Sequence, residues 1–257
     1  SQAAIVMDAE TGQVLYEKNA DIGKYPASIT KVMTILIALE HNLDPDYVVT
    51  MSENAIWGIE RTSTNIGLDV GEQVTVRDLM YATMVKSANE CAYALAELIA
   101  GNVESFADMM NERAQELGLS DTHFVTPNGL HDPDHYTTAK DLALLGAAAL
   151  ENPFFAEIAA TQYRRTEGSI PHTLKNKNRL LWEYEGGIGV KTGYTKAAGK
   201  CLVFAAERGE MKLVGAVLNC PTMWNTAKEL LDGGFRDYRV RRFLSRETVF
   251  SIPVENG

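Results

Sequence analysis

The chain has 257 residues, 46% of them hydrophobic, and a formal net charge of −10 at pH 7. That length and apolar content suffice for one large domain or for two lobes with a shared core. The acidic balance, with both signs of charge interspersed, argues against a protein that binds nucleic acid or an anionic membrane surface. The sequence contains no apolar run of about eighteen residues, so no transmembrane helix is expected.

The first residues predict a β-hairpin followed by a helix. Residues 3–7 and 13–16 are short apolar-rich runs joined by turn-forming residues, which is the pattern of two antiparallel strands. Pro26 favours the first turn of a helix, and apolar residues recur after it at helical spacing. We expect this helix to be buried over a broad face.

Four helices are predicted in the middle of the chain. Two of them begin with the pattern Thr-x-x-Asp, in which the threonine side chain caps the first turn, and two end at a glycine. The capped helices begin after Thr75 and Thr138, and the two others cover residues 90–100 and 104–117. Residues 126–133 are rich in proline, asparagine and glycine and predict a loop.

The last third of the chain returns to strands. Residues 189–195, 201–207 and 211–219 have the pattern of strands, and a helix is predicted over residues 223–243. Because strands lie at both ends of the sequence and helices between them, we expect an α+β fold. Its antiparallel sheet would be built from both chain ends and flanked by helices.

We expect residues 1–257 to form a single catalytic domain of two lobes. One lobe, about residues 1–50 and 160–257, would hold the sheet and its flanking helices. The other, about residues 51–159, would be an inserted helical lobe. Three short polar motifs of the sequence would then meet at the cleft between the lobes.

Ser28 and Lys31 form the first motif, Ser-x-x-Lys. They lie three residues apart at the start of a predicted helix, so both side chains project from one face. A serine hydroxyl becomes a good nucleophile only when a base takes its proton. A lysine amine can be that base if burial or nearby cations lower its pKa. We therefore predict that Ser28 is the nucleophile and Lys31 its general base.

The second motif, Ser87-Ala88-Asn89, lies between two predicted helices. The Ser87 hydroxyl is predicted to pass a proton to a leaving amine, and the Asn89 amide to hold a substrate carbonyl. Serine and asparagine are also common helix caps, so this motif alone is weak. Its weight comes from its place between the two other motifs.

The third motif, Lys191-Thr192-Gly193, lies on a predicted strand. Glycine at a strand edge permits another backbone to come close, so an extended peptide can pair there as an additional strand. Lys191 and Thr192 are predicted to bind the terminal carboxylate of that peptide. The backbone N–H groups of Ser28 and Tyr194 are the candidate oxyanion donors, and such a donor typically lowers a barrier by about 3–4 kcal/mol.

The order of these three motifs is that of penicillin-binding proteins and class A β-lactamases. The chain most resembles the serine-type D-alanyl-D-alanine carboxypeptidases of peptidase family S11, which are low-molecular-weight penicillin-binding proteins. The resemblance extends over nearly the whole length of the chain. Besides the motifs, it rests on residues 4–12, 26–28, 126–130, 178–181 and 189–195.

The resemblance implies a β-lactamase/transpeptidase-like fold and cleavage of the terminal D-alanine from peptidoglycan stem pentapeptides. Ser28 would be acylated by the peptide and the acyl-enzyme then hydrolysed, and β-lactams would acylate the same serine persistently. The resemblance also implies an exported protein at the extracytoplasmic face of the bacterial membrane or in the cell wall. Contact with the membrane is expected only through segments outside this chain.

The sequence departs from some members of this family in two places. Many continue into a small β-rich domain and an amphipathic anchor, whereas this chain ends soon after the strand-like residues 248–252, so those parts are expected to be absent or removed. Some also carry an arginine in the loop after the last long strand, which helps to hold the substrate carboxylate. Residues 219–223 of this chain contain no cationic side chain, which shifts that role to Lys191 and Thr192.

No cofactor or metal ion is predicted. The three cysteines have no metal-ligand spacing and are interpreted as buried thiols. His131 and His135 lie in a loop without a third ligand nearby. The expected partners are therefore the peptide substrate and β-lactam inhibitors, and no nucleic acid.

Three other functions share parts of this pattern. A class A β-lactamase needs a glutamate in a Glu-x-x-x-Asn pattern as a second base, and the segments around Glu151 and Glu157 do not provide it. A penicillin-binding sensor domain uses the same nucleophile, but the whole-length resemblance favours a carboxypeptidase. A DD-transpeptidase shares the acyl-enzyme and differs in its acceptor, which motifs do not encode. The sensor and the transpeptidase stay open as alternatives.

Overall fold

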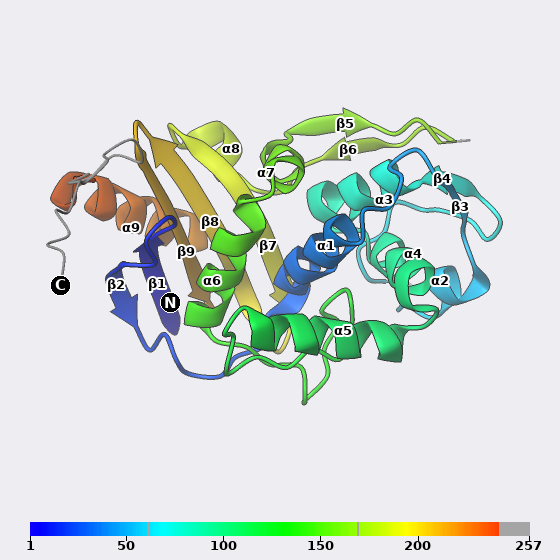
Figure 1. Ribbon diagram of the computed structural model, residues 1–257, viewed down its shortest axis with the longest axis horizontal. Coiled ribbons are helices and arrows are strands. Elements are labelled where there is room, and N and C mark those ends of the chain that lie inside the picture. The colour runs from blue at the N-terminus through cyan, green and yellow to red at the C-terminus, as the bar shows by residue number, and fades with distance from the viewer. Residues whose placement is uncertain (61, 169, 242–257) are drawn as a thin grey trace, which may run out of the picture.

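The structure, a computed structural model, describes residues 1–60, 62–168 and 170–241, and its main element is a five-stranded antiparallel sheet (Figure 1). The strand order is β2-β1-β9-β8-β7, so strands from the start and from the end of the sequence lie side by side. This confirms the predicted α+β fold with a sheet from both chain ends. The strands are β1 (Ala3–Asp8), β2 (Val14–Lys18), β7 (Gly187–Thr195), β8 (Gly199–Arg208) and β9 (Met211–Leu218).

Both faces of the sheet are covered, which explains why its inner strands are almost continuously apolar. On β1, Ile5 and Met7 belong to the larger core, whereas Ala4 and Val6 belong to the smaller core under α9 (Met223–Asp237). This separation follows from the two-residue period of a strand, which turns successive side chains to opposite faces. α9 covers one face of the sheet, and α6 covers the other (Figure 1).

α6 (Ala139–Leu150) packs closely on the sheet because a glycine faces it. A Cβ atom on Gly146 would lie 2.9 Å from Val203 Cγ1 on β8 and 3.2 Å from Val214 Cγ2 on β9. A larger residue would therefore push the helix away from the sheet. α6 lies within the predicted helical lobe, residues 51–159, yet it covers the sheet, and the division into two lobes stays a prediction.

The other predicted helices begin and end near the expected residues. α3 (Val76–Tyr81) and α6 are capped by the hydroxyls of Thr75 and Thr138, each of which accepts the N–H of the residue three positions later at 3.1 Å. α4 (Asn89–Ala100) and α5 (Val103–Glu116) are each followed within two residues by a glycine with positive φ. Glycine adopts this conformation without a clash of its side chain, so it ends a helix readily.

The helix that carries the first motif is buried on nearly all sides. A 3₁₀ turn, η1 (Ala27–Thr30), leads directly into α1 (Lys31–Glu40). α1 contacts α4, α5, α6 and α7 (Pro153–Ala160), as its broad apolar surface predicts. Lys31 is among its buried residues, so this side chain needs polar partners inside the protein.

The sequence does not predict several short elements of three to eight residues, because most of them are too short to show a period. The predicted helix over residues 223–243 is wrong at its end. α9 ends at Asp237 because Gly233 and Gly234 weaken its last turns and Tyr238 is extended. Residues 242–243 and the strand-like residues 248–252 lie outside the described residues. The unpredicted elements are β3 (Val48–Thr50), α2 (Glu53–Trp57), β4 (Gln73–Thr75), the π-helical η2 (Ala82–Lys86), α7, β5 (Tyr163–Arg165), β6 (Thr173–Lys175) and α8 (Leu180–Glu183).

Within the described part of the chain, no single helix is long and apolar enough to cross a membrane. α6 and α7 meet that criterion only as a pair, and they are bent by 110° relative to each other.

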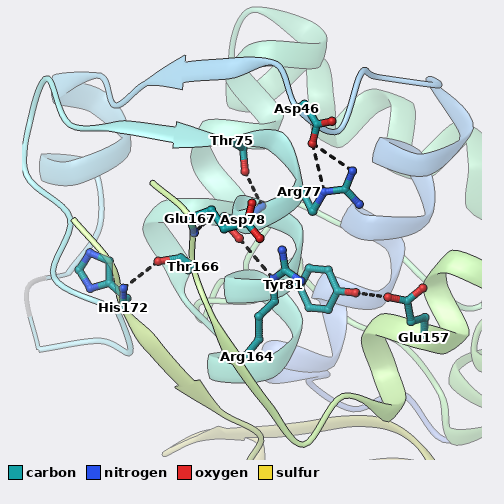
Figure 2. A network of polar contacts seen from close by, with 10 residues as sticks. All are labelled: Asp46, Thr75, Arg77, Asp78, Tyr81, Glu157, Arg164, Thr166, Glu167 and His172. Atoms are coloured by element: carbon teal, nitrogen blue, oxygen red, sulfur yellow. Dashed lines mark hydrogen bonds and ion pairs between the residues drawn. The ribbon is translucent and has the colours of Figure 1, made fainter. Parts of the chain in front are cut away.

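The β5–β6 hairpin is fixed to α3 by a buried ion pair (Figure 2). Asp78 is completely buried and accepts hydrogen bonds from Arg164 Nε at 3.3 Å and from the Glu167 N–H at 2.6 Å. The Arg164 guanidinium also lies 4.1 Å from the centre of the Tyr81 ring, whose hydroxyl donates to Glu157. Because a buried carboxylate is stable only with such partners, these contacts hold the hairpin in one position.

Candidate active site

Ser28 lies in the η1 turn, where the backbone has an unusual conformation. Ala27, directly before it, has φ +51°, in the left-handed region that costs a non-glycine residue about 1–2 kcal/mol. The loop of residues 126–137 packs against this turn, since a Cβ atom on Gly129 would lie 1.9 Å from the Ala27 carbonyl oxygen. The Thr30 hydroxyl donates to the same oxygen at 2.9 Å. These contacts hold the Ser28 hydroxyl at the start of α1.

Lys31 is completely buried and makes three polar contacts. Its Nζ lies 3.1 Å from Ser28 Oγ, 2.7 Å from Asn89 Oδ1 and 2.6 Å from the Asn128 carbonyl oxygen. Burial lowers the pKa of Lys31 well below its usual value, and the nearby charge of Lys191 lowers it further. These are the two causes that a lysine general base requires.

An ammonium ion can make all three contacts, and so can a neutral amine, but the lowered pKa of Lys31 favours the neutral amine. It has two N–H donors and a lone pair, whereas the ammonium ion has three donors and no acceptor. The carbonyl oxygens of Asn89 and Asn128 accept the two N–H groups, so the lone pair is left for the Ser28 hydroxyl. The geometry is therefore suited to transfer of the serine proton to Lys31.

The second motif follows the π-helical segment η2. Ser87 is buried and has φ +69°, in the left-handed region. Asn89 then begins α4 and donates its N–H to the Thr64 carbonyl at 2.9 Å. This turn directs the Asn89 side chain at Lys31, so the structure brings the second motif to the first. Within the described residues the Ser87 hydroxyl has no hydrogen bond.

Lys191 is the second buried lysine of the site. It is 2% exposed, and burial, followed by repulsion from Lys177, lowers its pKa to about 7. Among the residues that the structure describes, its one hydrogen bond runs from Nζ to the Thr192 carbonyl at 3.1 Å. Because an ammonium group has three donors, Lys191 keeps donors for a ligand.

β7, which carries the third motif, lies directly against the nucleophile turn. A Cβ atom on Gly193 would lie 2.9 Å from the Pro26 carbonyl oxygen and 3.2 Å from Ala27 Cβ, so this approach requires glycine. β7 is also an edge strand of the sheet, and an edge strand offers its N–H and C=O groups to an extended peptide. The N–H groups of Ser28 and Tyr194 stay predicted oxyanion donors.

A buried histidine supports the nucleophile turn from the loop of residues 126–137. His135 Nδ1 accepts the N–H groups of Val125 and Thr126 at 3.0 and 3.3 Å. The ring proton therefore lies on Nε2, which donates to Thr30 Oγ1 at 2.8 Å. Burial lowers the pKa of His135 to about 4, so the ring is neutral near pH 7.

Sequence reasoning missed two residues that build the site, Asn128 and His135. Asn128 lies in a segment that resembles the family, but its contribution is a backbone carbonyl, which the type of residue does not reveal. His135 is noted in the sequence only as a candidate metal ligand without a third partner. Its contacts show that it supports the turn around Thr30.

Comparison with known proteins places the chain in a family. A profile of the D-alanyl-D-alanine carboxypeptidases, Peptidase S11, matches residues 1–222. The D-alanyl-D-alanine carboxypeptidase DacF of Bacillus subtilis is 34% identical, over 100% of this chain and 68% of the relative. The D-alanyl-D-alanine carboxypeptidase DacC of Escherichia coli is 37% identical, over 92% of this chain and 61% of the relative. The chain thus spans about two thirds of the length of these relatives.

Solved structures give the same result. The Streptomyces K15 DD-transpeptidase is 35% identical and superposes with a TM-score of 0.87, over 92% of this chain and 97% of that chain. A penicillin-binding protein homolog from Mycobacterium tuberculosis is 33% identical with a TM-score of 0.85, over 98% and 95% of the two chains. These likenesses confirm the predicted transpeptidase-like fold. With its three motifs gathered at one site, the chain belongs to Peptidase S11, the family of serine-type D-alanyl-D-alanine carboxypeptidases.

Proposed function

We propose that this chain hydrolyses the terminal D-Ala-D-Ala bond of peptidoglycan stem peptides through an acyl-enzyme on Ser28. The observation that carries the proposal is the buried Lys31 amine, which lies 3.1 Å from Ser28 Oγ. Its two other contacts are carbonyl oxygens, which can accept both N–H groups of a neutral amine. The lowered pKa of Lys31 increases the share of the neutral amine that can act as a base.

In acylation, the Ser28 hydroxyl gives its proton to Lys31 while Oγ attacks the carbonyl carbon of the penultimate D-alanine. The N–H groups of Ser28 and Tyr194 stabilise the resulting oxyanion. The proton then passes from Lys31, by way of the Ser87 hydroxyl, to the nitrogen of the leaving D-alanine as the C–N bond breaks. An ester between Ser28 and the shortened peptide remains.

In deacylation, a water molecule attacks the ester carbonyl carbon and gives a proton to Lys31. Lys31 returns this proton to Ser28 Oγ as the ester C–O bond breaks, and the shortened peptide leaves as a carboxylic acid. The same base serves both steps because Asn89 and Asn128 hold it in place on their own.

The peptide substrate pairs with the free edge of β7. Gly193 lets this strand approach the nucleophile turn, so a peptide beside β7 passes directly in front of Ser28. Lys191 and the half-buried Thr192 lie three and two residues before Tyr194 on β7 and bind the terminal carboxylate of the substrate. The positive charge on Lys191 and its uncommitted donors support this role.

DD-transpeptidation is the second candidate, favoured by one observation. The Streptomyces K15 enzyme is described as a DD-transpeptidase in its crystal structure and as a D-alanyl-D-alanine carboxypeptidase among curated proteins. Both reactions share the acyl-enzyme and differ only in whether water or an amine accepts the acyl group. This chain is similar to that enzyme over most of its length.

The proposal extends to inhibitors and to the place of action. A β-lactam carries a reactive amide and a carboxylate, so it would acylate Ser28 as the peptide does and remain attached. Family S11 proteins are typically extracytoplasmic. We therefore place the activity at the outer face of the bacterial membrane or in the cell wall, where peptidoglycan is found.

The test is release of D-alanine from an N-acylated Lys-D-Ala-D-Ala tripeptide, with Ser28→Ala as the control. Steady release that depends on Ser28 supports the carboxypeptidase. A folded protein that forms a penicillin adduct but releases no D-alanine contradicts it. Adding an amine such as a D-amino acid then separates the two alternatives, because a transpeptidase joins it to the acyl group and a sensor does not.

A further inference from the structure

A groove of about 590 Å³ is formed by β5, β6, α8 and the end of η2. None of the residues that line it belongs to the three motifs. The lining includes one arginine, one carboxylate and three lysines, which are Lys86, Lys175 and Lys177. In a chain with a net charge of −10, this groove is a local excess of positive charge that attracts anions.

The three lysines of the groove form no ion pair with a carboxylate of the described residues. The one carboxylate in the lining, Glu183, already pairs with Arg179 at 2.6 Å. Lys177 Nζ makes one long hydrogen bond, 3.4 Å to Thr64 Oγ1. The charges of the lysines are therefore available to the anionic groups of a ligand.

Two exposed aromatic side chains form the apolar part of the groove. Tyr163 is 56% exposed and Trp182 is 40% exposed, and their ring centres lie 6.0 Å apart with the ring planes at 80°. Lys175 Nζ lies 5.5 and 5.9 Å from the two ring centres. Tyrosine and tryptophan give a binding surface a large, stiff contact area. An anion bound at Lys175 would thus lie directly beside two aromatic rings.

Hydrogen bonds hold the walls of the groove in a fixed position. Gln162 Nε2 donates to the Leu181 carbonyl at 2.7 Å, which joins β5 to α8 next to the aromatic pair. Asn176 is buried, and its amide donates to a nearby backbone carbonyl at 2.9 Å. Arg164 and Asp78 tie the β5–β6 hairpin to α3 (Figure 2). Because the surface is formed in advance, little ordering is needed when a ligand binds.

The cations of the groove follow one another along the chain. Buried and exposed residues alternate from Leu174 to Leu180, and Lys175, Lys177 and Arg179 are exposed. Side chains on one side of an extended segment repeat about every 7 Å. A row of cations at this spacing suits a chain that carries several anionic groups better than it suits a single small ion.

We propose that this groove binds an anionic polysaccharide. A sugar ring would pack on Trp182 and Tyr163, and its carboxylate or phosphate groups would bind the lysines. A sugar ring has C–H bonds on its faces and polar groups at its edge, so it fits an aromatic face with a cation beside it. The proposal goes beyond the reaction at Ser28 and does not depend on it.

Single-stranded nucleic acid also combines rings with negative charge, but it fits this groove less well. Its successive bases stack on the faces of aromatic side chains, whereas the two rings here are almost perpendicular and close together. The net charge of −10 also repels a polymer with a charge on every unit.

The test is binding of fluorescently labelled oligogalacturonate, whose sugars carry carboxylates, measured by fluorescence anisotropy. Binding should saturate and weaken as salt is added. A phosphorylated dextran shows whether phosphate serves in place of carboxylate. Neutral dextran has sugars without charge, and polyglutamate has charge without sugars, so each should bind at least about tenfold more weakly than the better anionic sugar polymer.

Two variants show whether this binding occurs in the groove. Trp182→Ala should weaken it about tenfold through loss of the larger ring. Trp57→Ala is its matched control, because Trp57 is 67% exposed on α2 and outside the groove. Lys175→Gln should weaken binding by a smaller factor and lower its salt dependence, whereas Lys140→Gln on α6 should do neither.

Three results would overturn the proposal. The first is that neither anionic sugar polymer binds. The second is that polyglutamate or a single-stranded oligo-dT binds as tightly as these polymers, which would indicate attraction to charge alone or a nucleic-acid site. The third is that Trp182→Ala and Trp57→Ala have the same effect while circular dichroism shows both variants folded.

Acylation of Ser28 by benzylpenicillin separates this proposal from the proposed function. Trp182→Ala and Lys175→Gln should be acylated at the rate of the unaltered protein, because neither residue belongs to the three motifs. If the unaltered protein binds the polysaccharide but is not acylated and releases no D-alanine, the proposed function fails and the groove proposal holds. If it releases D-alanine but binds neither anionic sugar polymer, the groove proposal alone fails.

Discussion

The two buried lysines of the site, Lys31 and Lys191, differ in how their ammonium groups are surrounded. Lys31 Nζ contacts three polar atoms of the protein, two of them carbonyl oxygens on distant segments. Lys191 Nζ contacts only the carbonyl of its own neighbour within the described residues. Burial lowers the pKa of both, but among the described residues only Lys31 has three polar contacts.

This difference matches the two roles proposed for these lysines, a general base and a ligand-binding cation. A base must point its lone pair at the nucleophile before the substrate arrives, so its other contacts are made by the protein. A ligand-binding cation must keep donors for the ligand. Asn89 and Asn128 therefore fix Lys31, whereas the β7 strand leaves Lys191 open to the substrate edge.

The largest effect is expected from a change of Ser28, the proposed nucleophile. Ser28→Ala removes the nucleophile, so D-alanine release and penicillin adduct formation should both be abolished. Intact-mass spectrometry after incubation with penicillin measures the adduct directly. An adduct on the variant would show that another residue is acylated and would remove Ser28 from its proposed role.

Lys31→Ala should slow acylation by about two to four powers of ten, which is the usual contribution of a general base. The loss should be similar for a peptide with a free carboxylate and for its amide, because Lys31 acts on Ser28 rather than on the chain end. Stopped-flow or quenched acylation by penicillin measures the rate. A loss of tenfold or less would mean that another group takes the serine proton.

The pH profile of kcat/KM should distinguish Lys191 from Lys31. Lys191 has a pKa of about 7, so it loses its charge, and its attraction for a carboxylate, as the pH rises through this value. For the free-carboxylate peptide, kcat/KM should therefore fall by up to about tenfold per pH unit above pH 7. For the amide this decline should be absent. The same alkaline decline with both substrates would assign it to another group.

The smallest effect is expected from His135→Phe, because His135 contacts Thr30 in the turn that precedes Lys31. The N–H groups of Val125 and Thr126 lose their acceptor, which should lower the free energy of unfolding by about 1–3 kcal/mol. His131→Phe is the matched control in the same loop, because His131 is exposed and makes an edge contact with Tyr25. Denaturant unfolding measures both, and equal stability of the two variants would contradict the supporting role.

The same histidine predicts an acid sensitivity with a defined sign. His135 is neutral in the folded state down to a pKa of about 4, whereas in the unfolded chain it binds a proton below about pH 6.5. Between these values the unfolded state holds more protons, so stability falls as the pH is lowered. His135→Phe should show a weaker decline over this window than His131→Phe.

The parts of the site that were predictable are those in which the type of side chain carries the chemistry. The sequence alone shows the three motifs: a serine with a lysine one turn away, then Ser-x-Asn, then Lys-Thr-Gly. The long strands and capped helices were predictable for a similar reason, since Thr75 and Thr138 bond the backbone that follows them.

The parts that escaped prediction depend on contacts between distant segments. The Asn128 carbonyl is an ordinary backbone atom until the loop packs on the η1 turn. β5 and β6 have three residues each, too few for a two-residue period, and their position depends on the buried pair of Asp78 and Arg164.

The contacts of Lys31 have a consequence for how this protein can be studied. Its two carbonyl partners lie 58 and 97 residues further along the chain, so the proposed base is held beside Ser28 only when α1, α4 and the loop of residues 126–137 are assembled together. An unfolded chain has no base beside Ser28 and should not be acylated. The amount of covalent labelling by a fluorescent penicillin should therefore be proportional to the fraction of folded molecules. During refolding, the time at which labelling begins would show when these distant segments assemble.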